Sequence, residues 1–181
     1  MMRLFFTLLV MVSLTVAMSQ YFDVGKQLEA KEMAKKIRVF NAEISTYEEV
    51  DVVIKDEKQW KNELTPEQFR ILRKQGTEPA TSSSLNQNKK TGIYECAACG
   101  NDLFTSDAKF DSGTGWPSFF QPVAKENVGA HEDNSFFMKR VEVHCARCGG
   151  HLGHIFPDGP PPTGQRYCIN GESLRFIEAN K

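Results

Sequence analysis

Two short cysteine motifs constrain the fold of this chain more than any other feature. Residues 96–100 (CAACG) and 145–149 (CARCG) are near copies, and 45 residues, 100–144, separate the last cysteine of one from the first of the other. A C-x-x-C-G segment forms a tight turn with two thiolates on one side, and two facing turns supply the four sulfur ligands that zinc prefers. The pattern predicts one structural zinc ion that clamps two distant parts of a domain, bound by Cys96, Cys99, Cys145 and Cys148.

The same four cysteines also allow two redox-active pairs or two disulfides, which an exported protein would make more plausible. A redox C-x-x-C pair of the thioredoxin type stands in a βαβ pattern, and none is visible in this sequence. We therefore favour the metal, which says little about a reaction.

The fifth cysteine, Cys168, has neighbours suited to chemistry. A lone cysteine is commonly an inert buried residue. Here Arg166 and Asn170 lie two residues to either side, so on a strand the three side chains share one face. A guanidinium favours the thiolate, which is the nucleophilic form. The Asn170 amide can donate to the sulfur or to a developing oxyanion.

Three more residues are candidates for the same site. His151 and His154 follow the second motif, and imidazole is a suitable acid near neutral pH. Either histidine could instead be a zinc ligand or a packed core residue. Trp116 lies between the Gly-x-Gly loop 113–115 and a proline, where a fixed aromatic ring can cradle a methyl or thioether group.

Local patterns predict the secondary structure. Beyond residue 92, short apolar–polar alternations such as 135–143 and 174–177 are broken by turn pairs, which indicates an antiparallel β body. Residues 65–68 (TPEQ) combine a capping box with proline at the first helical position, and Gly76 stands where a stop is expected. A helix over 65–75 is predicted.

The N-terminal third carries a different signal. Residues 1–19 contain one arginine, an uncharged run and a small-x-small site, the pattern of an export signal. An uncleaved membrane anchor is the alternative, although the run is short for a span. Residues 20–55 are interpreted as a poorly defined spacer, in which 46–54 could form a strand, and 56–181 as the folded domain. A net charge of −1 gives no basic surface for nucleic acid.

Three long segments together resemble the B-type methionine sulfoxide reductases over about residues 56–179. They are residues 60–78 (WKNELTPEQFRILRKQGTE), 92–120 (GIYECAACGNDLFTSDAKFDSGTGWPSFF) and 141–170 (VEVHCARCGGHLGHIFPDGPPPTGQRYCIN). The resemblance implies a mainly β fold in which two antiparallel sheets form a barrel-like arrangement, clamped by the four-cysteine zinc site, with short N-terminal helices. It implies reduction of the R epimer of methionine sulfoxide in oxidised peptides and proteins.

The resemblance also assigns roles. Cys168 is expected to attack the sulfoxide and to be left as a sulfenic acid. Trp116 is expected to pack against the substrate methyl group. Arg166 would tune the thiolate, and the residues that bind or protonate the sulfoxide oxygen would be His151, His154 and Asn170.

One position departs from the family pattern. Many members carry a second, resolving cysteine in the Ser-Gly-x-Gly-Trp-Pro loop, where this chain has Thr114. We therefore expect a one-cysteine cycle in which an external thiol, such as thioredoxin, glutaredoxin or a small thiol, restores Cys168. A monomer is expected, with zinc as the sole bound cofactor.

Two other classes of protein share parts of this pattern. The zinc-clamped β architecture is similar to binding modules of the yippee type and to the drug-binding domain of cereblon, in which an aromatic cage holds a ligand. Such a cage needs no nucleophile beside arginine and asparagine, so Cys168 favours the enzyme. A zinc hydrolase needs an open metal position, which four cysteine ligands do not leave.

Overall fold

A computed structural model describes residues 35–133 and 140–179. The elements below belong to one compact unit, Lys36–Lys181. The export signal expected at 1–19 lies outside the described residues, as do residues 135–139 of the strand expected at 135–143. Within the described part of the chain, no helix has the length and apolar character needed to cross a membrane.

The described residues form three antiparallel sheets. The largest has the spatial order β5 (Lys109–Phe110), β6 (Ser118–Phe119), β10 (Arg166–Ile169), β9 (His151–Phe156), β8 (Arg140–Cys145) and β7 (Val128–Asp133). A second has the order β11 (Leu174–Glu178), β3 (Gly92–Cys96) and β4 (Asp102–Thr105), and β1 (Lys36–Asn41) pairs with β2 (Thr46–Asp51). The predicted mainly β fold is confirmed, although the sheets close no barrel within residues 35–133 and 140–179.

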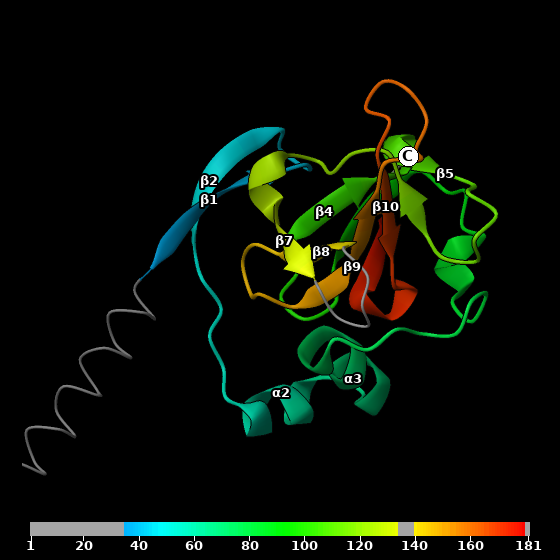
Figure 1. Ribbon diagram of the computed structural model, residues 1–181. Helices are drawn as coiled ribbons and strands as arrows, with labels where there is room; N and C mark the ends of the chain where they lie inside the picture. The colour runs from blue at the N-terminus through cyan, green and yellow to red at the C-terminus, as the bar shows by residue number, and fades with distance from the viewer. Residues whose placement is uncertain (1–34, 134–139, 180–181) are drawn as a thin grey trace, which may run out of the picture. The chain divides into compact units, whose positions relative to one another are not determined.

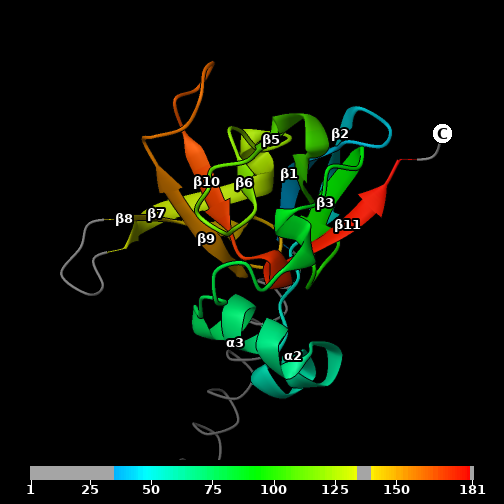
Figure 2. The same cartoon turned by 90° about the vertical axis from the view of Figure 1, so that its right-hand side faces the viewer.

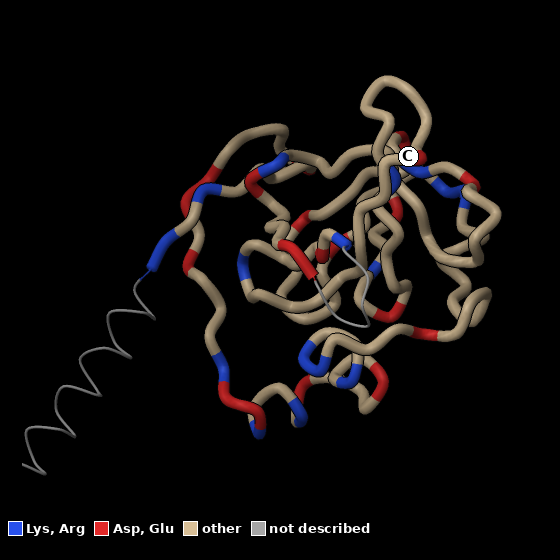
Figure 3. The backbone as a smooth tube through the Cα atoms, viewed as in Figure 1, with Lys and Arg blue, Asp and Glu red and all other residues tan. Residues whose placement is uncertain are grey.

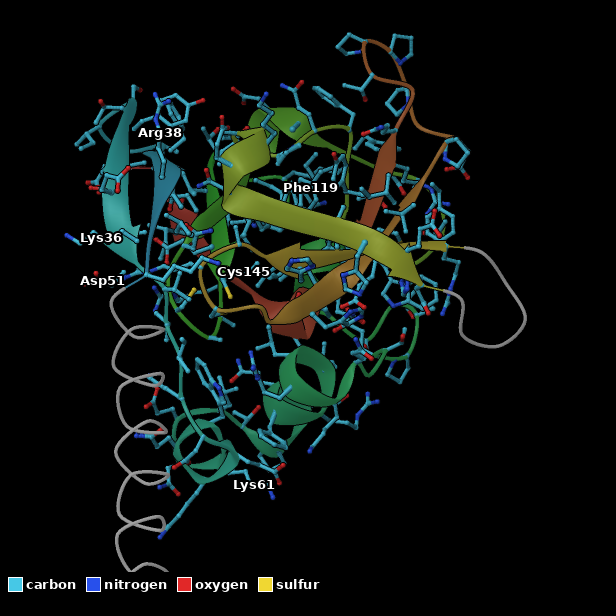
Figure 4. The ribbon with its side chains drawn as sticks, turned by 60° about the vertical axis from the view of Figure 1, so that its left-hand side comes forward. Lys36, Arg38, Asp51, Lys61, Phe119 and Cys145 are labelled. Carbon is cyan, nitrogen blue, oxygen red and sulfur yellow. The ribbon has the colours of Figure 1, made fainter. Side chains whose placement is uncertain are left out.

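Aromatic side chains fill the space between the two larger sheets. Phe119 of the six-stranded sheet stacks on Phe104 of β4, with ring centroids 4.4 Å apart, and meets Tyr94 of β3 edge-on at 5.0 Å. All three are fully buried. Figure 4 shows Phe119 in the interior of the domain. Burial of each ring contributes roughly 1.5–3 kcal/mol, so this cluster helps to hold the two sheets together.

Two short helices, α2 (Glu57–Glu63) and α3 (Pro66–Lys74), lie together at one end of the domain (Figures 1 and 2). The predicted helix is confirmed: the Thr65 hydroxyl accepts from the Gln68 N–H, and the Gln68 side chain accepts from the Thr65 N–H. Basic and acidic positions are interspersed along both helices (Figure 3). The 3-10 turns of the domain are η1 (Ser84–Asn86), η2 (Ser106–Ala108), η3 (Lys125–Asn127) and η5 (Gly171–Ser173).

The compact unit begins at Lys36, earlier than the boundary near residue 56 expected from the sequence. The hairpin β1–β2 is fixed to the domain by the fully buried Asn127. Its amide oxygen accepts from the Phe40 N–H at 2.8 Å, and its amide nitrogen donates to the carbonyls of Phe40 and Asp102, both at 2.7 Å. The exposed side chains of β2 gave no local sign of this attachment, because it is made by backbone groups and a distant side chain.

Candidate active site and metal centre

The four motif cysteines converge on one point. Their sulfur atoms all lie within 4.8 Å of one another, with Cys96 to Cys148 at 3.7 Å and Cys99 to Cys145 at 3.5 Å. Tetrahedral zinc with Zn–S bonds of about 2.3 Å places its sulfurs about 3.8 Å apart. A disulfide needs about 2.05 Å, and all five cysteines of the chain are free. The four cysteines could therefore hold one metal ion, and the disulfide alternative is wrong.

The local backbone explains why the cysteines meet. Gly100 and Gly149 have φ angles of +70° and +67°, which favour glycine, and their N–H groups donate to the carbonyls of Cys96 at 2.8 Å and Cys145 at 2.9 Å. One turn follows β3 and the other follows β8, so the sulfur cluster joins the two larger sheets. Figure 4 shows Cys145 near the Lys36 and Asp51 end of the hairpin.

Cys168 lies on a different part of the six-stranded sheet, at the floor of a small cleft. The strand register places it opposite His154 of β9 and Ser118 of β6, and residues directly opposite in antiparallel strands project from the same face. The cleft has a volume of about 180 Å³ and is lined by Thr77, Trp116, Arg140, Gly153, His154, Phe156, Cys168 and Asn170.

The cleft therefore brings together four of the six predicted site residues: Trp116, His154, Cys168 and Asn170. The other two, His151 and Arg166, do not line it. A larger cavity of about 600 Å³ lies between the turn of the hairpin and the ends of β3 and β11. No cysteine or histidine lines it among the described residues. Of these two cavities, the smaller is the one lined by both a thiol and an imidazole.

Opposing effects set the pKa of the Cys168 thiol. Burial raises its pKa above the ordinary value and outweighs the Arg166 guanidinium and the Thr114 hydroxyl, which both lower it. Arg166 lowers the pKa of Cys168, as predicted, but by less than burial raises it. Two neighbours fix the Arg166 side chain. It donates two hydrogen bonds of 2.9 Å to Asp158, and its guanidinium carbon lies 4.5 Å from the Phe156 ring centroid.

His154 is held by a carboxylate. Its Nε2 lies 2.9 Å from Oδ2 of Asp133, which also accepts from Arg140 at 2.7 Å. With Nε2–H donated to Asp133, only Nδ1 is left for a ligand. Burial lowers the pKa of His154 and prevails over Asp133, which raises it. The lowered pKa makes the protonated ring a stronger acid than a free imidazolium.

His151 does not line the cleft but lies against His154, with ring centroids 5.5 Å apart and ring planes at 66°. It is 3% exposed, and its Nδ1 lies 2.8 Å from Oε1 of Glu142, whereas its Nε2 has no hydrogen-bond partner. Residues three apart on a regular strand face opposite sides. Here the β8–β9 register steps from Gly153 to His151, and this bulge turns both rings to one face.

Asn170 uses its side-chain oxygen and one of its two amide N–H groups within the protein, which leaves one N–H. Its oxygen accepts from the Glu78 N–H at 3.0 Å, and its nitrogen donates to the Leu152 carbonyl at 2.9 Å. At 3% exposure the side chain still lines the cleft, but these two bonds fix it. In this structure Asn170 positions the strand of Cys168 against the loop after α3.

Glu78 is a site residue that sequence reasoning missed. Its carbonyl accepts from the indole N–H of Trp116 at 3.1 Å. Its buried carboxylate accepts from the N–H groups of Gly171 at 2.7 Å and Glu172 at 2.9 Å. One residue thus holds both the tryptophan and the segment that follows Cys168. No local pattern marks it, because its partners lie far away in the sequence.

Comparison with known proteins agrees with this geometry. A family profile described as "SelR domain" matches residues 64–178, well over half of the chain. A protein of Methanosarcina mazei is 62% identical over 124 residues, which cover 68% of this chain and 89% of that protein. One of Leptospira interrogans is 57% identical over 124 residues, covering 68% of this chain and 95% of its own length. Both are named "Peptide methionine sulfoxide reductase MsrB".

Proposed function

Because the chain belongs to the SelR-domain family of peptide methionine sulfoxide reductases, we propose that it reduces the R epimer of methionine sulfoxide in peptides and proteins through a sulfenic acid on Cys168. The chain is an oxidoreductase that acts on methionine sulfoxide. The observation that carries the finer proposal is the position of Cys168, directly opposite His154 and in one cleft with Trp116. The family's activity in protein repair is proposed for this chain as well.

The proposed first step transfers oxygen from the substrate to the protein. The Cys168 sulfur attacks the sulfoxide sulfur, the S–O bond of the substrate breaks, and the oxygen takes up a proton. The net change is Cys168–SH + sulfoxide → Cys168–SOH + thioether, in which methionine sulfoxide is reduced and the cysteine oxidised. We assign the polar contact with oxygen to His154 and the contact with the methyl group to Trp116.

The proposed second step needs a thiol from outside the chain. The other four cysteines lie together in the sulfur cluster, and Thr114 occupies the loop that faces Cys168. An external thiol attacks the sulfenic acid, Cys168–SOH + R'SH → Cys168–S–S–R' + H2O, and a second thiol releases Cys168–SH as a disulfide R'S–SR' forms. Thioredoxin, a related exported protein or a small thiol fits this role.

We assign zinc to the sulfur cluster because four thiolates at tetrahedral spacing suit this metal, and because four protein ligands leave no open position for substrate. The ion would hold the two sheets together, and the proposed chemical steps take place at Cys168. We further propose that the protein is a monomer that is exported by its N-terminal 19 residues, with anchoring by an uncleaved segment as the alternative.

The experiment incubates the purified protein with dithiothreitol and each epimer of methionine sulfoxide. We expect turnover of the R epimer, and loss of it in Cys168→Ser. Mass analysis after substrate without reductant should show one added oxygen and no disulfide. Equal turnover of both epimers would refute the stereochemical assignment, and an active Cys168→Ser protein would refute the mechanism.

A further inference from the structure

A row of four side chains crosses the six-stranded sheet from its edge to Cys168. The register pairs His131 of β7 with Glu142 of β8, Glu142 with His154 of β9, and His154 with Cys168 of β10. Figures 1 and 2 show these strands side by side, with β7 at the edge. Directly paired residues project from one face, so the row connects the solvent at the sheet edge with the reacting sulfur.

Glu142 occupies the middle of this row and contacts two imidazoles. Oε2 lies 3.0 Å from Nε2 of His131, whose side chain is 52% exposed, and Oε1 lies 2.8 Å from Nδ1 of His151, whose side chain is 3% exposed. The carboxylate side chain itself is 6% exposed. One carboxylate therefore bridges a solvent-facing imidazole and a buried one.

His131 is the titratable group that contacts the bridge at the sheet edge, and on the α3 side Glu142 and His151 line a cavity of about 220 Å³ together with Arg73, Lys74 and Gln75. Gln75 donates to Oε2 of Glu142 at 3.0 Å from the α3 side, but an amide does not carry a proton in exchange. His144, also on β8, lies 5.2 Å from the His131 ring, measured between centroids. At the inner end, the His151 ring meets that of His154 at 5.5 Å, and the unpartnered Nε2 of His151 is free to receive or give a proton.

The reaction requires a supply of protons to the cleft. Over the complete cycle, sulfoxide + 2 R'SH → thioether + R'SSR' + H2O, the sulfoxide oxygen leaves as water and has to gain two protons inside a cleft of about 180 Å³. When the thiols react as thiolates, these protons come from solvent. An imidazole that has given its proton must be recharged before the next turnover.

We propose that His131, Glu142 and His151 form a proton-supply path from the sheet edge to the active cleft, with His131 as the surface entry. The inference rests on the proposed role of the cleft histidines in protonating the sulfoxide oxygen. Neither His131 nor Glu142 touches the substrate in this scheme: both are positioning and relay residues that act through His151 and His154.

His131→Asn tests the path, because it removes the titratable entry from an exposed position where folding is not at risk. Turnover of the R epimer with dithiothreitol is measured against pH, in H2O and in D2O. We expect kcat to fall about tenfold at mildly alkaline pH, where protons in solvent are scarce, with KM unchanged and a larger solvent isotope effect on kcat. Millimolar imidazole should restore kcat in this variant.

Glu142→Gln interrupts the proposed path inside the protein. It should lower kcat, and imidazole should not restore the activity. The melting temperature of this variant shows whether the protein is still folded. Glu132→Gln is the matched control, since it removes a charge from the neighbouring exposed position of β7 and should behave as wild type. A His131→Asn protein with the wild-type kcat and pH profile would overturn the inference, and so would a loss that imidazole does not restore. Wild type inactive on the R epimer would instead overturn the proposed function, and the inference with it.

Discussion

The hydroxyl of Thr114 lies beside the sulfur of Cys168 and lowers the pKa of that thiol. The Ser112 hydroxyl lies 2.8 Å from that of Thr114 and 2.8 Å from that of the buried Ser118, which faces Cys168 across the β6–β10 pair. A chain of hydroxyl groups therefore supports the reacting sulfur at the position where related proteins often carry a second thiol. In the proposed mechanism these hydroxyl groups would surround the sulfenic acid on Cys168 until an external thiol reacts with it.

Thr114→Cys should convert the one-cysteine cycle into a disulfide cycle. A side chain that already lies beside the Cys168 sulfur can approach to the bonding distance of about 2.05 Å with a small rotation. After one turnover without reductant, the variant should lose two hydrogens from its mass and retain no added oxygen. Thr114→Ser is the control and should keep the oxygen; an oxygen adduct in Thr114→Cys would contradict the predicted geometry.

The reactivity of Cys168 should respond to Arg166 and Asp158 in opposite directions. Burial raises the pKa of the thiol, Arg166 lowers it and the nearby Asp158 raises it. The thiolate fraction at pH 8 should therefore be below that of a free cysteine with a pKa of about 8.5. Arg166→Gln should lower it further, and Asp158→Asn should increase it. Iodoacetamide labelling of the Cys168 peptide against pH measures all three, and a shared profile would refute this balance.

Trp116→Ala should weaken substrate binding. The ring lines the cleft, and contact of a thioether or methyl group with an aromatic ring contributes up to about 1.5 kcal/mol, which is about tenfold in KM. Trp116→Phe separates packing from the indole hydrogen bond to the Glu78 carbonyl, because it keeps an apolar ring. Steady-state kinetics should place most of the loss in KM for alanine. An unchanged KM would contradict the assignment of the methyl group to this side chain.

Glu78→Gln should destabilise the domain by about 1–3 kcal/mol, because one of two buried backbone N–H groups, those of Gly171 and Glu172, loses a charged acceptor. Urea unfolding gives the change in the free energy of unfolding. Glu178→Gln is a suitable control, since its exposed ion pair with Lys90 should contribute within about 0.5 kcal/mol. Equal effects of the two substitutions would mean that Glu78 does not hold the loop.

Loss of the metal should unfold the domain rather than stop one chemical step. The sulfur cluster joins the turns after β3 and β8, and binding energy at such a site is folding energy. Cys145→Ser, or a strong chelator, should lower the melting temperature by more than about ten degrees, as a loss of several kcal/mol implies. Cys168→Ser is the control and should retain the metal, with one equivalent measured by elemental analysis. A chelated protein with wild-type stability would refute a structural metal.

Features with a local cause were predictable from the sequence. The glycine-ended cysteine turns, the capping box at Thr65 and the strand near residues 174–177 each depend on neighbours within a few positions. The same is true of Cys168 and Arg166, which share a strand face. In each case the residues that form the sequence pattern are also the residues that make the local contacts.

What the sequence could not provide depends on distant contacts. Glu78 and Asp133 act on partners far along the chain, and the hairpin is fixed by Asn127 from another segment. The net direction of the Cys168 pKa shift could not be predicted for the same reason: its Arg166 neighbour is visible in the sequence, whereas the burial that prevails over it is a property of the folded domain.

The bulge in β9 makes the chemistry of the cleft depend on strand register. His151 and His154 are three residues apart and face one side because Leu152 has no counterpart in the β8–β9 register. Regular pairing of β9 at the same length would turn one of the two rings to the opposite face. Deleting Leu152 would leave the histidines two residues apart, a spacing at which a regular strand again places both side chains on one face. The pair of imidazoles therefore depends on the number of paired residues between them and tolerates a shorter strand better than a regular one of the same length.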